Sequence, residues 1–98
     1  MAGLMIARIV IRDKSELDEY LANVKGVASK HGAEVMFLGE IKRVLNGAPD
    51  AHDMLVIVRF PSADAASAWF DDPEYQPLVE TREAGGKMEM IAYEPLAA

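Results

Sequence analysis

Two segments of this sequence are apolar at nearly every position, where a strand with one exposed face would alternate between apolar and polar residues. They are residues 4–12 (LMIARIVIR) and 54–60 (MLVIVRF), and both are rich in Ile and Val. Such runs are typical of strands that are covered on both faces. Because 98 residues are enough for only one small domain, few residues are left over to cover two faces of a sheet.

Each of these predicted strands is followed by a segment with the signals of a helix. After the first strand, Asp13 and Glu16 form a capping-box pattern and Gly32 supplies a stop signal. The apolar stripe between them recurs at helical spacing and consists of Leu17, Tyr20, Leu21, Val24, Val27, Ala28 and His31. After the second strand, Ser62 is the expected N-cap and Pro73 closely follows the helix end. Both segments are therefore predicted to be helices with one buried side.

Three further elements complete the predicted chain. Residues 34–45 are expected to form a strand, with Val35 and Phe37 on one face and a bulge or bend at Gly39. Residues 75–83 suit a short helix with a proline in its first turn. Residues 87–94 (KMEMIAYE) are predicted to be the final strand.

This order predicts an α+β fold of ferredoxin-like βαββαβ topology. Residues 1–98 would form a single domain in which both main helices cover one face of a four-stranded antiparallel sheet. The other face would expose either the set Met5, Ala7 and Ile9 or the residues that alternate with it. Because an exposed apolar face of this size is an association surface, we expect a homodimer. Its two sheets would pack face to face and close a dimeric α+β barrel.

The charge of the chain is negative and unevenly distributed. Ten basic and sixteen acidic residues give a net charge of −6, which argues against a nucleic-acid partner. Residues 61–98 carry eight acids against Arg82 and Lys87. A pocket in this region would therefore favour a neutral or aromatic ligand over an anionic one, unless one of these bases or a strand arginine offsets the acids.

Two absences narrow the class of protein further. The sequence has no cysteine, which excludes disulfides and thiol catalysis. No apolar run approaches the roughly 20 residues of a membrane span. We therefore expect a cytoplasmic protein with no membrane partner.

One histidine and three aromatic residues are candidates for a functional site. His31 lies at the end of the first helix, where it could act as a general acid or base, or could cap the last carbonyls. Tyr20, Trp69 and Tyr75 could line a small-molecule pocket between helices and sheet. The alternative is that they are the large side chains that a small core needs.

Arginines lie within both apolar strands. Arg8 could bind a carboxylate substrate in the same pocket through a two-pronged contact. It could instead pair with Glu40 or Glu89, because an unpaired buried charge is costly. Arg59 offers the same two alternatives.

The second histidine lies in an acidic loop. His52 with Asp50 and Asp53 has the composition of a metal site but not a recognised ligand spacing. We therefore expect no metal and no bound cofactor. Haem binding by a histidine is a weaker alternative.

The segment from Phe60 to Gln76 carries a set of short motifs. They are Phe60-Pro61-Ser62, Ala65-Ala66, Trp69-Phe70 and Pro73-Glu74-Tyr75-Gln76. Together with the opening Met5-Ile6-Ala7-Arg8-Ile9 and the helix end His31-Gly32, they resemble an uncharacterised bacterial family, domain of unknown function 1330. The resemblance covers nearly the whole chain. It implies a dimeric α+β barrel, a fold that also hosts cofactor-free monooxygenases, haem-degrading enzymes, isomerases and non-catalytic proteins, and it implies no particular activity.

These observations lead to one functional hypothesis and one alternative. The hypothesis is a homodimer that binds a small neutral or aromatic molecule, as a cofactor-independent monooxygenase- or isomerase-like enzyme would. Its pocket would be lined by Arg8, Tyr20, Trp69 and Tyr75, with His31 as the catalytic proton-transfer residue. The alternative is a non-catalytic dimerisation or ligand-binding module.

Overall fold

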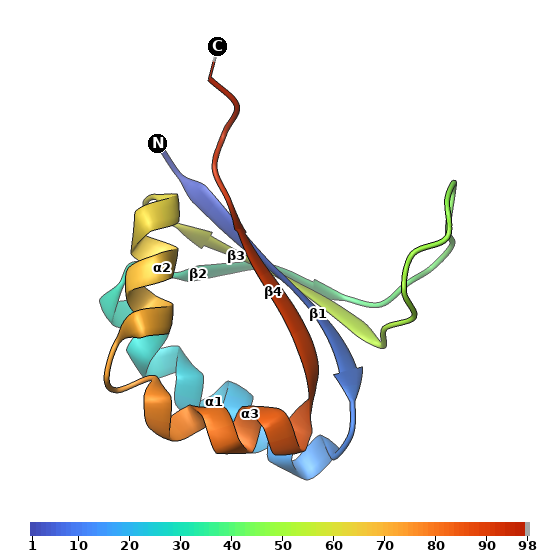
Figure 1. Ribbon diagram of the computed structural model, residues 1–98, viewed down its shortest axis with the longest axis horizontal. Coiled ribbons are helices and arrows are strands. Elements are labelled where there is room, and N and C mark those ends of the chain that lie inside the picture. Colours follow the sequence, from blue (N-terminus) through green and yellow to red (C-terminus); the bar gives the residue numbers. More distant parts are fainter. Residues whose placement is uncertain (98) are drawn as a thin grey trace.

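The computed structural model describes residues 1–97, and its elements follow the predicted order (Figure 1). The strands are β1 (Gly3–Ile11), β2 (Glu34–Gly39), β3 (Met54–Phe60) and β4 (Gly86–Tyr93). The helices are α1 (Lys14–Lys30), α2 (Ala63–Asp71) and α3 (Val79–Gly85), and a 3₁₀ turn (Gln76–Leu78) precedes α3. The four strands form one sheet in the order β2–β3–β1–β4, with every neighbouring pair antiparallel. The ferredoxin-like βαββαβ fold predicted from the sequence is confirmed.

Both main helices begin at the predicted caps. The Asp13 carboxylate accepts hydrogen bonds from the backbone N–H groups of Ser15 (3.0 Å) and Glu16 (3.2 Å), and the Ser62 hydroxyl accepts from the N–H of Ala65 (3.1 Å). These contacts satisfy N–H groups that have no partner inside the helix. The backbone N–H of Asp13 itself donates to the Gly85 carbonyl (3.2 Å), which ties the start of α1 to the end of α3. No helix within residues 1–97 combines the length and the hydropathy that crossing a membrane requires.

β2 is shorter than the sequence predicts. Its pairing with β3 ends at Gly39, which lies opposite Leu55, so the prediction of a strand through residues 40–45 is wrong. The cause is the start of β3 at Met54, because the register beyond Gly39 leaves β2 almost no β3 residues to pair with. Residues 40–53 instead form a long loop that extends away from the sheet (Figure 1).

The bulge in β2 also lies at a different position from the predicted one. The pairing register shifts between Val35 and Phe37 rather than at Gly39. Val35 lies opposite Val58 and Phe37 lies opposite Ile57. Val58 and Ile57 are consecutive residues of β3 and therefore point to opposite faces. Because each β2 residue shares a face with its partner, Val35 and Phe37 are on different faces, and the prediction that they share one is wrong.

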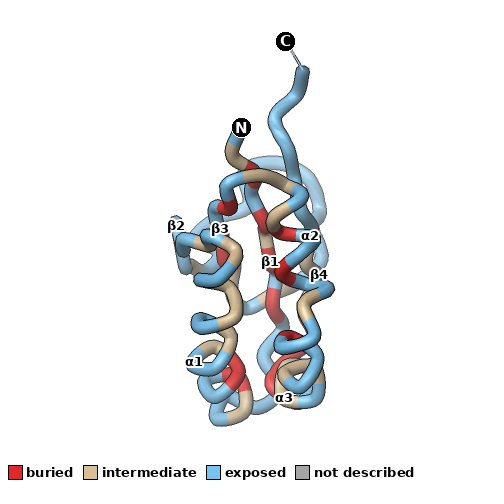
Figure 2. Tube along the Cα trace, turned by 90° about the vertical axis from the view of Figure 1, so that its left-hand side faces the viewer, coloured by how far each residue is buried: buried red, intermediate tan, exposed pale blue. Residues whose placement is uncertain are grey.

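The core lies between the helices and one face of the sheet. All three helices are on the same side of the sheet (Figure 1), and in the view from that side the buried positions of β1 lie between α1 and α3 (Figure 2). The buried side chains are Met5, Ala7, Ile9, Leu17, Tyr20, Val56, Val58, Phe60, Ala66, Trp69 and Tyr75. Tyr75 and Phe60 are fully buried, so the aromatic residues near α2 form the most enclosed part of the domain.

No helix covers the opposite side of the sheet in the described chain (Figure 1), and we call this side the open face. Its central residues are Ile6 and Ile57, which lie directly opposite each other. The half-exposed apolar side chains around them are Leu4, Val10, Phe37, Ile91 and Tyr93, at 38–52% exposure. The β1 residues that alternate with Met5, Ala7 and Ile9 therefore point to the open face.

Candidate functional site

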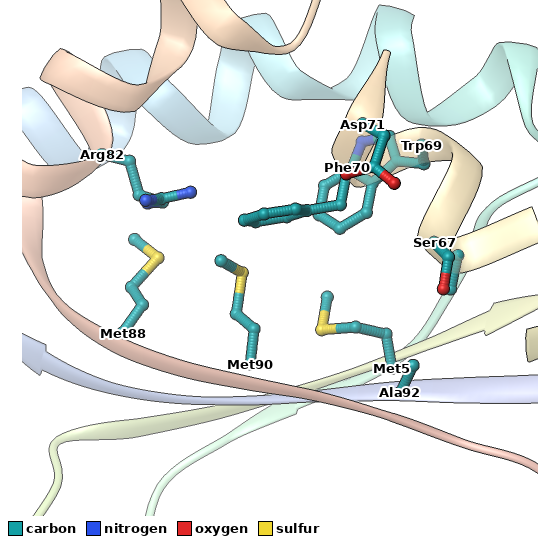
Figure 3. Close-up of a pocket in the computed structure, with 10 residues that line it drawn as sticks. Met5, Ser67, Trp69, Phe70, Asp71, Arg82, Met88, Met90 and Ala92 are labelled. Carbon is teal, nitrogen blue, oxygen red and sulfur yellow. The ribbon is translucent and has the colours of Figure 1, made fainter.

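A cavity of about 390 Å³ lies between α2, α3 and the sheet (Figure 3). It is lined by Met5, Ala66, Ser67, Trp69, Phe70, Asp71, Arg82, Met88, Met90 and Ala92. Three methionine side chains rise from β1 and β4 toward the helices, while Phe70 and Trp69 lie above them (Figure 3). Most of its lining residues are thus apolar, and its charged groups are Arg82 and Asp71.

The aromatic side chains above the cavity form one contiguous cluster. The ring of Trp69 lies 4.8 Å from that of Tyr75 in an edge-to-face arrangement and 5.7 Å from that of Phe60. Phe70 lies 5.2 Å from Tyr75. Such pairs favour defined relative orientations, so the cluster gives the cavity a rigid wall. The indole Nε1 of Trp69 is buried and has no hydrogen-bond partner within residues 1–97.

A chain of three polar side chains lies behind this wall. The Tyr20 and Tyr75 hydroxyls are hydrogen-bonded at 2.8 Å, and the Arg82 guanidinium donates to the Tyr75 oxygen at 2.9 Å. Burial, together with the neighbouring Tyr75, raises the pKa of the Tyr20 phenol well above its ordinary value. The Tyr20 phenol therefore stays protonated at neutral pH, and the chain connects the core of the domain to the cavity.

Arg82 is the polar group that this chain presents to the cavity. Its side chain is only 12% exposed, and its second nitrogen contacts the Glu83 carboxylate at 3.0 Å. The guanidinium lies 5.6 Å from the ring centre of Phe70 and 5.7 Å from that of Tyr75, within the range of cation–π attraction. Burial alone would lower the pKa of Arg82, but the hydrogen bonds to Tyr75 and Glu83 raise it, so the cation is retained.

His31 lies outside the cavity lining, in an ionic contact near the surface. Its Nε2 is 2.8 Å from the Asp72 carboxylate, and Lys30 contacts both Asp72 and Glu74. The hydrogen bond with His31, followed by one from the Glu74 backbone, lowers the pKa of Asp72 from 3.8 to about 2. These contacts fasten the end of α1 to the residue that follows α2.

The cavity residues do not fit a haem held by a histidine. The chain has two histidines, and neither His31 nor His52 lines the cavity. Within residues 1–97, no group of three or more His, Asp or Glu side chains is arranged to hold a metal ion. The Nδ1 atom of His52 instead contacts the Asp50 carbonyl at 2.9 Å.

Arg8 lies on the other side of the sheet from the cavity. It points to the open face, where its guanidinium is 3.8 Å from the Glu89 carboxylate. It lines a second, smaller hollow of about 260 Å³ together with His52 and Lys87. The pairing with Glu89 is one of the two alternatives considered from the sequence, and it separates Arg8 from the cavity.

The structure brings together only part of the predicted pocket. Trp69 lines the cavity, while Tyr20 and Tyr75 support its wall from within the core. Arg8 is placed on the opposite face and His31 at the surface, so neither shares the cavity with these aromatics.

The sequence identifies Arg82 only as a base that could offset the acids near a pocket and does not predict its contact with Tyr75. The signal that could have revealed it is its position seven residues after Tyr75, because two helical turns place such residues on one side. The segment reads as an exposed polar helix (VETRE), and the proline at position 77 interrupts the helical period. The contact therefore becomes visible only in the folded chain.

The fold and the site define a class of protein: a ferredoxin-like α+β domain with a cavity between its second helix and the sheet. The chain belongs to the family described as "Domain of unknown function (DUF1330)", which matches residues 2–96. The resemblance seen in the sequence is thereby confirmed. The sequence matches no curated protein.

Several solved structures share this fold. A protein of unknown function from Rhodopseudomonas palustris is 23% identical with a TM-score of 0.79, covering 99% of this chain and 84% of that chain. SnoaB, a cofactor-independent oxygenase from Streptomyces nogalater, is 11% identical with a TM-score of 0.66, covering 99% and 95%. A dimeric ferredoxin-like protein of unknown function from Jannaschia sp. CCS1 is 12% identical with a TM-score of 0.65, covering 97% and 100%. At these identities the likeness establishes the fold alone.

Proposed function

We propose that this protein binds a small neutral or aromatic molecule in the cavity between α2, α3 and the sheet. The observation that carries the proposal is the cavity itself: about 390 Å³ of space lined mostly by apolar residues, together with Ser67, Asp71 and Arg82. Small-molecule sites are typically apolar clefts of about 300–1,000 Å³ in which a few polar groups fix the orientation of the ligand. The cavity lies at the small end of that range and suits a ligand of one or two rings.

The side chains of the cavity support an aromatic ligand in particular. Met5, Met88 and Met90 offer polarizable thioethers that adapt to a flat ring. Phe70 and Trp69 offer ring faces and edges on the opposite side (Figure 3). A flat ring between these two layers would contact both.

The position of the single tryptophan provides a direct binding assay. Trp69 is the one tryptophan of the chain and lines the cavity, so a bound ring should change its fluorescence. We expect saturable quenching or a spectral shift when one- and two-ring aromatic compounds are titrated into the protein. Titrations of a series of such compounds that leave Trp69 fluorescence and the heat of mixing unchanged would refute the proposal.

A pair of matched variants tests whether the signal comes from the cavity. Ala92 lines the cavity and is exposed, whereas Ala68 is exposed on α2 and lies outside the lining. Ala92→Phe should fill the cavity and abolish binding, because the added ring takes the place of the ligand. Ala68→Phe adds the same volume elsewhere and should bind as the wild type does.

We propose further that the protein is a homodimer formed through its open face. Ile6 and Ile57 lie at the centre of this face, surrounded by half-exposed apolar side chains. Contiguous apolar surface of this kind marks an interaction site. The Jannaschia protein of the same fold is described as dimeric, which supports a second copy of this chain as the partner.

The homodimer predicts a solution mass twice that of the 10.7 kDa chain. Light scattering at micromolar concentration should give that mass for the wild type, and a monomer would refute the proposal. Ile6→Glu places a charge at the centre of the open face and should yield monomers. Ala22→Glu, at an exposed position of α1, adds the same charge elsewhere and should leave the dimer intact.

The enzymatic form of this function is a cofactor-independent oxygenase- or isomerase-like reaction on the bound molecule. The shared fold with SnoaB supports it. The non-catalytic form, a ligand-binding or dimerisation module, is favoured by the way the polar candidates are engaged: Tyr20 with Tyr75, His31 with Asp72, and Arg8 with Glu89. Oxygen uptake and product analysis, measured with a bound aromatic compound and no added cofactor, separate the two forms. Turnover would establish the enzyme, and tight binding without turnover would establish the module.

A further inference from the structure

We propose that the ligand of this cavity is an aromatic acid whose carboxylate is bound by the guanidinium of Arg82. This inference rests on the proposed binding function and adds the charge of the ligand to it. The observations that carry it are the burial of Arg82, its unused hydrogen-bond donors and its position at one end of a cavity whose other residues are mostly apolar.

The charge of Arg82 is only weakly compensated within the chain. Its side chain is 12% exposed, so most of its hydration has been removed. The carboxylate nearest to it is that of Glu83, whose side chain is 59% exposed. Water screens an exposed carboxylate strongly, whereas burial of a cation is costly unless an anion lies against it. A carboxylate bound in the cavity would supply the compensating charge.

The guanidinium also has hydrogen-bond donors to spare. Arginine carries five N–H donors in a planar fork. In the part of the chain that the structure describes, Arg82 uses two of its nitrogens, one on the Tyr75 hydroxyl and one on Glu83. The remaining donors suit a carboxylate, which accepts two parallel hydrogen bonds from a guanidinium. Tyr75 and Phe70 hold the fork in place through the contacts described above.

The rest of the cavity suits the ring of such an acid. Figure 3 shows Arg82 at one end, with its guanidinium pointing toward Phe70 across the space above Met88 and Met90. An acid with its carboxylate at Arg82 would therefore direct its ring between the methionines and Phe70. Such a ligand matches the polar end and the apolar body of the cavity at the same time.

Asp71 is the group in the lining that argues for a cationic ligand instead. It is exposed, so water reduces its influence on a charge deeper in the cavity. Arg82 is the more buried of the two charges and should dominate the selection. A cationic probe is nevertheless part of the test.

The test compares three probes that share one ring system and differ in charge. They are 1-naphthoate, 1-naphthamide and 1-naphthylmethylammonium, titrated calorimetrically into the full chain at pH 7. We expect naphthoate to bind about tenfold or more tightly than naphthamide, because a hydrogen-bonded ion pair replaces neutral hydrogen bonds. The ammonium probe should bind most weakly.

Two variants assign the preference to one residue. Arg82→Gln removes the cation and should reduce naphthoate affinity to that of naphthamide, with naphthamide affinity unchanged. Lys87→Gln removes the same charge from an exposed position outside the lining and should leave the preference intact. Near-ultraviolet circular dichroism verifies that both variants are folded. The affinities of the three probes for the wild-type protein test the preference for a carboxylate even if Arg82→Gln does not fold.

The outcomes distinguish this inference from the function on which it rests. Naphthamide binding as tightly as naphthoate, or ammonium binding tightest, would overturn the aromatic acid and leave the binding function standing. If Arg82→Gln lowers stability without changing the preference between probes, Arg82 only supports Tyr75 and the inference fails. Failure of all three probes to bind would count against both the inference and the binding function.

Discussion

The hydrogen-bonded chain of Tyr20, Tyr75 and Arg82 makes Tyr75→Phe the most informative single change in this domain. Tyr75 is fully buried, and its hydroxyl is the central member of the chain. Removing that one oxygen leaves the ring and its packing in place. The buried hydroxyl of Tyr20 and an N–H of Arg82 both lose their partner.

The expected cost follows from the two hydrogen bonds. A neutral pair such as the two phenols contributes about 0.5–1.5 kcal/mol, and a bond to a charged group contributes about 1.5–3 kcal/mol. Tyr75→Phe should therefore lower the free energy of unfolding by about 2–4 kcal/mol. Domains of this size are stable by about 5–15 kcal/mol in total, so the change is large enough to measure and small enough to leave folded protein.

Urea unfolding, followed by Trp69 fluorescence, measures the effect. All variants are compared at one protein concentration, because the stability of a dimer depends on concentration. Tyr20→Phe breaks only the bond between the phenols and should cost about 1 kcal/mol. Ser29→Ala is the control for loss of a hydroxyl, because Ser29 is exposed on α1 and away from the open face, and it should change stability by less than about 0.5 kcal/mol.

The double variant supplies the decisive comparison. Once Tyr75 is phenylalanine, the Tyr20 hydroxyl has already lost its partner, so its removal should cost nothing further or restore some stability. Fully additive losses in the double variant, or a Tyr75→Phe protein as stable as Ser29→Ala, would refute the description of these side chains as one connected chain.

Three further predictions concern packing and the surface contacts of α1. Gly85→Ala should lower the free energy of unfolding by about 1–3 kcal/mol, because the added Cβ would lie 2.7 Å from the backbone of Leu17. Gly26→Ala meets nothing within 4 Å and should raise the free energy of unfolding by about 0.5–1 kcal/mol. A loss of stability in urea unfolding of Gly26→Ala would contradict its open surroundings. The hydrogen bond with His31 lowers the pKa of Asp72 from 3.8 to about 2, so Asp72 stabilises the fold fully above about pH 4 and progressively less as pH falls toward 2. In acid titrations, Asp72→Asn should lose less stability over this pH range than the wild type does. His31→Ala should lower thermal stability and leave the affinity of aromatic probes unchanged, and loss of binding or turnover at unchanged stability would make His31 a functional residue after all.

The topology was predictable because local signals and the apolar pattern agree. The caps at Asp13 and Ser62 begin the two main helices where expected, and the uninterrupted apolar runs mark the two central strands, β1 and β3. The length of β2 was not predictable in the same way. Ile41, Val44 and Leu45 continue its apolar pattern, but a strand extends only as far as its neighbour offers pairing partners, and β3 begins only at Met54.

The candidate site was predictable only where a residue's role follows from its own element. Trp69 lies on the inner side of α2, and both the pattern and the structure place it against the sheet. The contacts of Tyr75 with Tyr20 and Arg82 depend on how α1, α2 and α3 pack. Periodicity within one helix carries no information about such contacts. Arg8 shows the converse, because a residue in the middle of a strand can point to either face, and the sequence does not say which face the helices cover.

The methionine floor of the cavity has a consequence for the protein's response to oxidants. Met5, Met88 and Met90 are half of the six methionines in the chain, and all three line one apolar space. Oxidation of a thioether to the sulfoxide converts a flexible apolar side chain into a polar one, and sulfoxide reductases reverse it. Met88 and Met90 are only partly buried, so peroxide reaches them before it reaches Met5. Oxidation would thus make this part of the cavity polar and lower its affinity for the proposed aromatic ligand, and a bound ring would shield the same sulfur atoms.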